Sequence, residues 1–110
     1  MSKNAENTVI TPEELGCGVY TFKKPTTIDG EPVTEIRYNM SNINGSTIRR
    51  AKGELQMRGY TVAVKELDEV FHATIFAIAA GLTIDNVEAF SAVDYNAVAN
   101  IARDFLFVEA

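Results

Sequence analysis

The sequence contains few of the residues on which most enzyme and metal chemistry depends. Among its 110 residues there is one cysteine, one histidine and no tryptophan. A lone Cys17 cannot form an internal disulfide bond, and one cysteine with one histidine is too small a set for a zinc site. His72 lies on an otherwise apolar segment, where a structural role is more common than catalysis, because acid–base chemistry needs an oriented partner. We therefore expect no enzyme activity, no metal and no cofactor.

Basic residues and long hydrophobic runs are scarce as well. Ten Lys and Arg residues stand against fifteen Asp and Glu residues, which makes the net charge −5. Nucleic-acid backbones and anionic membrane surfaces are bound by concentrated positive charge, so neither is an expected partner. The longest apolar run, residues 75–80, is too short to span a bilayer, and residues 1–8 carry no apolar segment of signal-peptide length. With no disulfide and no membrane span expected, a cytoplasmic location is predicted.

The length and the distribution of apolar residues predict one domain. A chain of 110 residues can bury a core of its own without cross-links. Residues 1–18 are polar, lack any periodic pattern and include two of the glycines, so we predict a flexible N-terminal arm there. The first β-prone run starts at Val19, which places a single α+β domain over residues 19–110.

Residues 19–40 have the pattern of a β-hairpin. The runs 19–22 and 33–40 are rich in β-branched and aromatic residues, and the second alternates apolar and polar side chains. Asp29 and Gly30 between them are typical of a tight hairpin turn, because glycine tolerates the positive φ that the turn requires. A two-stranded hairpin alone is marginally stable in water, so we expect this one to pack on helices.

Four helices are predicted after the hairpin, over about residues 46–58, 69–80, 84–90 and 92–107. Each follows a residue able to cap a helix, and two of them end at a glycine. The expected caps are Ser46, Asp68, Thr83 and Ser91, and the glycines are Gly59 and Gly81. Residues 60–67 are β-prone and fit either an extended linker or a third strand, of which we favour the linker. The elements together predict an α+β fold, mainly α, with an N-terminal hairpin packed on a bundle of three to four helices.

The predicted helices carry unequal amounts of apolar surface. The helix at 46–58 has only a narrow stripe, formed by Ile48, Ala51 and Leu55, whereas the helix at 69–80 is apolar almost all round and should be central. The last helix should be anchored by Val98, Ile101 and Phe105. Because the hairpin and the narrow stripe can cover little surface, some aromatic side chains are expected to stay accessible to a partner helix or a second copy. The candidate partner-binding residues are Phe71, Phe76, Phe90 and Phe107.

A series of positions along the chain resembles a known family. The series consists of Lys24-Pro25, Asp29-Gly30, Arg58-Gly59, the alanine-rich residues 75–82, Asp85, Val87, Phe90, Asp94-Tyr95, Val98 and Phe105-Leu106. Over roughly residues 20–107 this order resembles the tail assembly chaperones of contractile-tailed phages or prophages. These are small proteins encoded between the tail tube and tape measure genes.

The resemblance implies a non-enzymatic protein of the bacterial host cytoplasm that is absent from the mature virion. Its implied partners are the tape measure protein and possibly the tail tube protein. The accessible aromatic residues separately predict weak homo-oligomers when the partner is absent. A long tape measure helix exposes apolar stripes, which a small helical protein can cover by helix-in-groove packing. Two alternatives stay open at this stage: a structural minor tail or tail completion protein of the virion, and a small enzyme.

Overall fold

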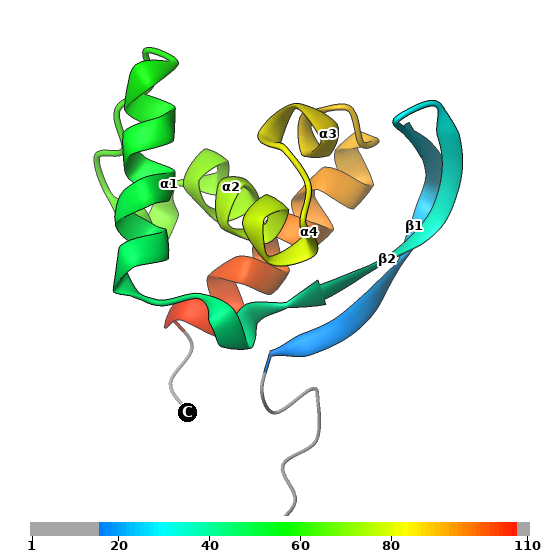
Figure 1. Ribbon diagram of the computed structural model, residues 1–110, viewed down its shortest axis with the longest axis horizontal. Coiled ribbons are helices and arrows are strands. Elements are labelled where there is room, and N and C mark those ends of the chain that lie inside the picture. The colour runs from blue at the N-terminus through cyan, green and yellow to red at the C-terminus, as the bar shows by residue number, and fades with distance from the viewer. Residues whose placement is uncertain (1–15, 108–110) are drawn as a thin grey trace, which may run out of the picture.

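The structure is a computed structural model that describes residues 16–107. An antiparallel β-hairpin precedes four α-helices, which confirms the predicted α+β, mainly α architecture. Figure 1 shows the long hairpin curving past the helices, with α2 and α4 crossing at the centre and α1 standing to one side. Most of the predicted N-terminal arm, residues 1–15, lies outside the described residues.

The hairpin is formed by β1, Cys17–Ile28, and β2, Glu31–Asn39. Its turn is the predicted one, since Asp29 and Gly30 both have positive φ, 53° and 82°. β1 begins two residues earlier than predicted, because Cys17 pairs with Asn39 of β2 and its thiol donates a hydrogen bond of 3.0 Å to the Asn39 side-chain oxygen. Cys17 and Gly18 therefore belong to the hairpin and not to an arm.

The paired register of the hairpin is interrupted between Thr21 and Thr26. Residues 22–25 lie in this irregular part of β1, so the backbone amides of Lys23 and Lys24 are directed to a partner outside the ladder. Phe22, in the same stretch, is buried against the helices. The irregularity consequently marks the place where the hairpin is fastened to the rest of the fold.

The helices are α1, Gly45–Met57, α2, Glu69–Ala80, α3, Ile84–Glu88, and α4, Ala92–Phe107. Short 3-10 turns, η1 and η2, occupy Met40–Asn42 and Lys65–Leu67. As predicted, α2 is central: every residue from Phe71 to Ala77 is buried, against α4, α1, α3 and β2. α1 contributes only Ala51 and Leu55 to the core, with Ile48 half-buried beside them.

The helix ends follow local capping signals, with one correction. Asp68 accepts a hydrogen bond from the Phe71 amide (2.9 Å) at the start of α2, and Gly81 ends that helix with φ 74°. α1, however, is capped by Asn44 and not by Ser46, because Asn44 and Thr47 form a reciprocal capping box. Ser46 consequently lies inside the helix.

Two further segments differ from the prediction. Residues 60–67 do not form one extended linker, because η2 turns the chain at Lys65–Leu67 before Asp68 caps α2. α3 ends at Glu88, two residues before the predicted end, and the amide of Ala89 already closes the helix on the Asn86 carbonyl.

The buried face of α4 is rotated relative to the predicted one. Val98 is fully buried, but Ile101 is only half-buried and Phe105 is 39% exposed. The buried side chains of α4 are Asp94, Val98, Ala99 and Ala102. Val98 and the carboxylate of Asp94 therefore anchor the helix. Asp94 is buried because the N-terminal turn of α4 faces the hairpin.

Candidate functional site

The four predicted partner-binding residues differ in their exposure to solvent. Phe71 and Phe76 have no exposed surface and Phe90 is buried as well, so these three are core residues in this conformation. Phe90 packs edge-on against Phe22 of the hairpin, with ring centroids 4.7 Å apart. Phe107 alone remains at the surface, 37% exposed, at the end of α4. Of the four residues, Phe107 alone is accessible in the structure, and a role of any of them in partner binding stays a prediction.

Other apolar side chains are exposed instead. Met57 at the end of α1 is 90% exposed, Leu67 in η2 80% and Val93 in the first turn of α4 62%. Phe105 joins Phe107 at the last turn of α4. Single exposed apolar residues are ordinary on protein surfaces, but side chains exposed to this degree are available as contacts for another chain.

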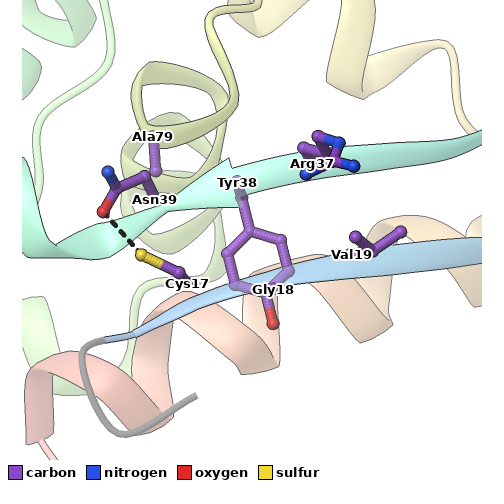
Figure 2. A pocket seen from close by; sticks show the side chains of 7 residues that line it. All are labelled: Cys17, Gly18, Val19, Arg37, Tyr38, Asn39 and Ala79. Carbon is purple, nitrogen blue, oxygen red and sulfur yellow. Dashed lines mark hydrogen bonds between the residues drawn. The ribbon is translucent and has the colours of Figure 1, made fainter. Parts of the chain in front are cut away.

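A hollow lies at the open end of the hairpin, where β1 begins and β2 ends, and Ala79 of α2 also lines it (Figure 2). Gly18 of β1 pairs with Tyr38 of β2, and the Tyr38 ring lies over Gly18. Only glycine leaves room for it, because a Cβ atom at position 18 would come within 2.6 Å of the Tyr38 hydroxyl oxygen. The Tyr38 ring also packs on Phe76, with centroids 5.3 Å apart. The Cys17 thiol is oriented toward Asn39 at this edge. The hollow thus presents an aromatic ring and one thiol, and Arg37 borders it.

The buried carboxylate of Asp94 fastens the hairpin to α4. Its Oδ1 accepts hydrogen bonds from the Tyr20 hydroxyl (2.6 Å) and the Lys23 amide (2.8 Å). Its Oδ2 accepts from the Ser91 hydroxyl (2.7 Å) and the Lys24 amide (3.0 Å). Asp94 has no exposed surface and lies in the first turn of α4, where the helix dipole favours negative charge. Ser91 caps α4 as predicted by accepting from the Asp94 amide (3.2 Å).

The hydrogen bonds keep this buried carboxyl ionised. Burial alone would raise the pKa of Asp94, but the donors from Tyr20, Lys23, Ser91 and Lys24 outweigh it and lower that pKa to about 2. Burial and the neighbouring carboxylate raise the pKa of Tyr20 to about 12. At neutral pH, Tyr20 is therefore protonated and Asp94 is ionised, so the phenol donates its hydrogen bond to a carboxylate. This hydrogen bond connects β1 to α4.

The sequence predicted the Ser91–Asp94 cap but not the attachment of the hairpin. Asp94 lies 71 residues from Lys23 and 74 from Tyr20. A contact between residues so far apart in the sequence leaves no local pattern. The capping box with Ser91 also explains an aspartate at position 94, so the sequence gives no reason to look for a second role.

His72 is buried, and its ring contacts two other segments of the chain. Its Nε2 donates to the Lys65 carbonyl (2.7 Å), and its ring packs edge-on against Phe107 with centroids 5.7 Å apart. The side chain thereby connects η2 to the end of α4.

We expect the pKa of the His72 imidazole to lie below its ordinary value. Burial lowers the pKa of His72 from 6.5, against the opposing effects of the Lys65 carbonyl and Asp68. The folded protein therefore favours the neutral ring, whose contribution to stability is complete above pH 6.5 and declines as the pH falls below it. Because the chain has a single histidine, an NMR titration of its ring protons measures this pKa directly. Phe107→Ala, which exposes the ring, should return the pKa toward 6.5. A wild-type pKa at or above that value would contradict the packing described.

Within residues 16–107, no three His, Cys, Asp or Glu side chains lie together as metal ligands would. No helix in that range combines the length and the apolar character needed to cross a membrane. Comparison with models of known protein families, with curated proteins and with solved structures produced no match to this chain.

Proposed function

We propose that this protein is a phage tail assembly chaperone, a non-enzymatic adaptor that binds the tape measure protein and assists polymerisation of the tail tube. The proposal rests on the resemblance over residues 20–107. Several positions of that series have defined roles in the fold: Asp29-Gly30 forms the hairpin turn, Arg58-Gly59 ends α1, and Asp94 fastens the hairpin. A cytoplasmic location in the bacterial host and absence from the mature virion belong to the same proposal.

The observation that carries the proposal is the exposure of large apolar side chains on an otherwise closed core. Leu67 and Val93 are more than half exposed, although Val98 and Phe71 nearby in the fold are fully buried. Exposed apolar side chains offer contact area to the apolar stripe of a partner helix. A chaperone for a long helical protein requires such area.

Co-expression with the tape measure protein encoded beside it should test this function. We expect the tape measure protein to stay soluble and to co-purify with this chain, because its apolar stripes are covered. Leu67→Ser together with Val93→Ser should reduce recovery of the complex, whereas Thr61→Ser with Thr34→Ser, at exposed polar positions, should not.

Two results would oppose the proposal. Failure of the wild-type chain to retain the tape measure protein would remove the chaperone assignment. Detection of the chain in purified particles at a fixed stoichiometry would support a structural minor tail or tail completion protein instead.

A further inference from the structure

We propose that a shallow groove along α4 binds a helix that carries lysine or arginine residues on a partner protein. The groove consists of two neighbouring hollows that share Glu69 and Asn96. One hollow extends toward Glu88 and Phe90, at the end of α3, and the other extends toward Leu67 in η2. The two hollows meet at Glu69 at the start of α2 and at Asn96 of α4, and together they make up the proposed groove.

One face of α4 lines the groove from end to end. The residues recur every three or four positions, which places them on a single side of the helix. At 1.5 Å per residue, the stretch from Ala92 to Arg103 is about 16 Å long. Small side chains at two of these positions allow another backbone to approach closely, as in helix–helix packing. The lining residues are Ala92, Tyr95, Asn96, Ala99, Asn100 and Arg103.

The charge of the groove selects a basic occupant. Glu66, Glu69 and Glu88 border it, all are exposed, and none of them forms an ion pair in the described part of the chain. Burial raises the pKa of Tyr95, and Glu69 and Glu88 raise it further, so both carboxylates act on the ring between them. Arg103 lines the same hollow as Glu66 and partly offsets its charge, whereas the hollow at the α3 end is lined by Glu69 and Glu88 and by no basic residue. The basic residues of a bound helix therefore belong toward the α3 end.

The apolar part of the groove selects an amphipathic helix over a single charged side chain. Phe90 and Ala99 are buried beneath it, and Leu67 projects at its rim with 80% of its surface exposed. An apolar stripe can contact these residues while flanking Lys or Arg side chains reach the carboxylates. The inference rests on the proposed function only for the identity of the partner, which would be the tape measure protein.

Two designed peptides test the groove without that partner. Both are helices of about 12 residues, matched to the groove length, with the same leucine stripe; one carries flanking lysines and the other glutamates. We expect the lysine peptide to shift the amide NMR signals of residues 66–69 and 88–103, and the glutamate peptide to bind at least about tenfold more weakly. Shifts spread over the whole chain, equal binding of both peptides, or no binding would overturn the groove.

Matched variants locate the contact. Glu69→Gln with Glu88→Gln should weaken binding of the lysine peptide about tenfold, whereas Glu31→Gln with Glu35→Gln removes the same charge from the hairpin and should leave it unchanged. Equal losses in the two pairs would mean that only net charge matters and would overturn the site. Both pairs replace exposed residues, and circular dichroism checks that each is folded.

Binding experiments with the tape measure protein test the proposed groove and the proposed chaperone function separately. If wild type binds it and Glu69→Lys with Glu88→Lys does not, both proposals are supported. If the charge-reversed variant binds as well as wild type, the groove is overturned and the chaperone function stands. If wild type does not bind, the function is overturned, and the peptide experiment decides on the groove.

Discussion

Asp94→Asn is expected to destabilise the protein by several kcal/mol, although the two side chains have nearly the same shape. An asparagine oxygen can still accept from Tyr20 and the Lys23 amide, but its NH₂ group would face the Lys24 amide, which is itself a donor. Losing a buried charge-assisted network costs about 3–5 kcal/mol, a large part of the roughly 5–15 kcal/mol that holds a small domain together. Chemical denaturation followed by circular dichroism measures the loss.

Asp104→Asn is the matched control for this change. Asp104 lies on the same helix but is exposed, and its contact with Arg103 at 3.8 Å is a surface ion pair. Its replacement should alter the unfolding free energy by less than about 1 kcal/mol. Equal stability of wild type and Asp94→Asn would show that the carboxylate does not fasten the hairpin.

The effect of Asp94→Asn should depend on pH in one direction. The folded pKa of about 2 lies below the ordinary 3.8, so the carboxylate contributes stability that is complete above a pH of about 4 and lost as the pH falls toward 2. The difference in unfolding free energy between wild type and variant should therefore shrink over that window. A difference that stays constant would mean that the charge of Asp94 is not the source of the stabilisation.

Val98→Asp is expected to abolish cooperative folding. Val98 has no exposed surface and packs on the face of α4 that meets α2, so the substitution removes apolar contacts and buries a charge without a partner. Each effect costs several kcal/mol, comparable with the whole stability of a small domain. Thermal unfolding followed by circular dichroism should show no sharp transition. Asn100→Asp, at an exposed position two residues further on, should melt close to wild type. A cooperative transition in Val98→Asp within a few degrees of wild type would contradict the burial of this face.

The parts of the fold that the sequence predicted are those with local signals. The Asp29-Gly30 turn, the Asp68 cap and the glycine ends of α1 and α2 each depend on residues within one turn of the chain. Where two residues close in the sequence could serve, the local pattern was not decisive: Asn44 and Ser46 are both good caps, and Thr47 favours Asn44 through the capping box.

The surface was harder to predict, because it depends on where the hairpin lies. Phe22 packs on Phe90 and Tyr38 packs on Phe76, so the hairpin contributes to the burial of two aromatic residues that were predicted to be accessible. The inward face of the hairpin thus covers aromatic side chains of the helical part of the chain. Tyr20 and Phe22 alternate with the exposed Thr21 and share the inward face of β1. This alternation indicates which face of the strand is buried, but it does not indicate which residues of the helical part that face meets.

The distance along the chain between the hairpin and Asp94 has a consequence for the order of folding. The hairpin is synthesised first, yet the acceptor for Tyr20 and Lys23 leaves the ribosome more than 70 residues later. At about 5–20 residues per second, the donors of β1 wait several seconds for the Asp94 carboxylate. Closing so long a loop is also the slow kind of step that high contact order imposes. A nascent chain stopped before Ser91 should therefore leave the irregular stretch of β1 around Lys23 and Lys24 sensitive to protease, and protection of that stretch should begin only when the first turn of α4 has emerged.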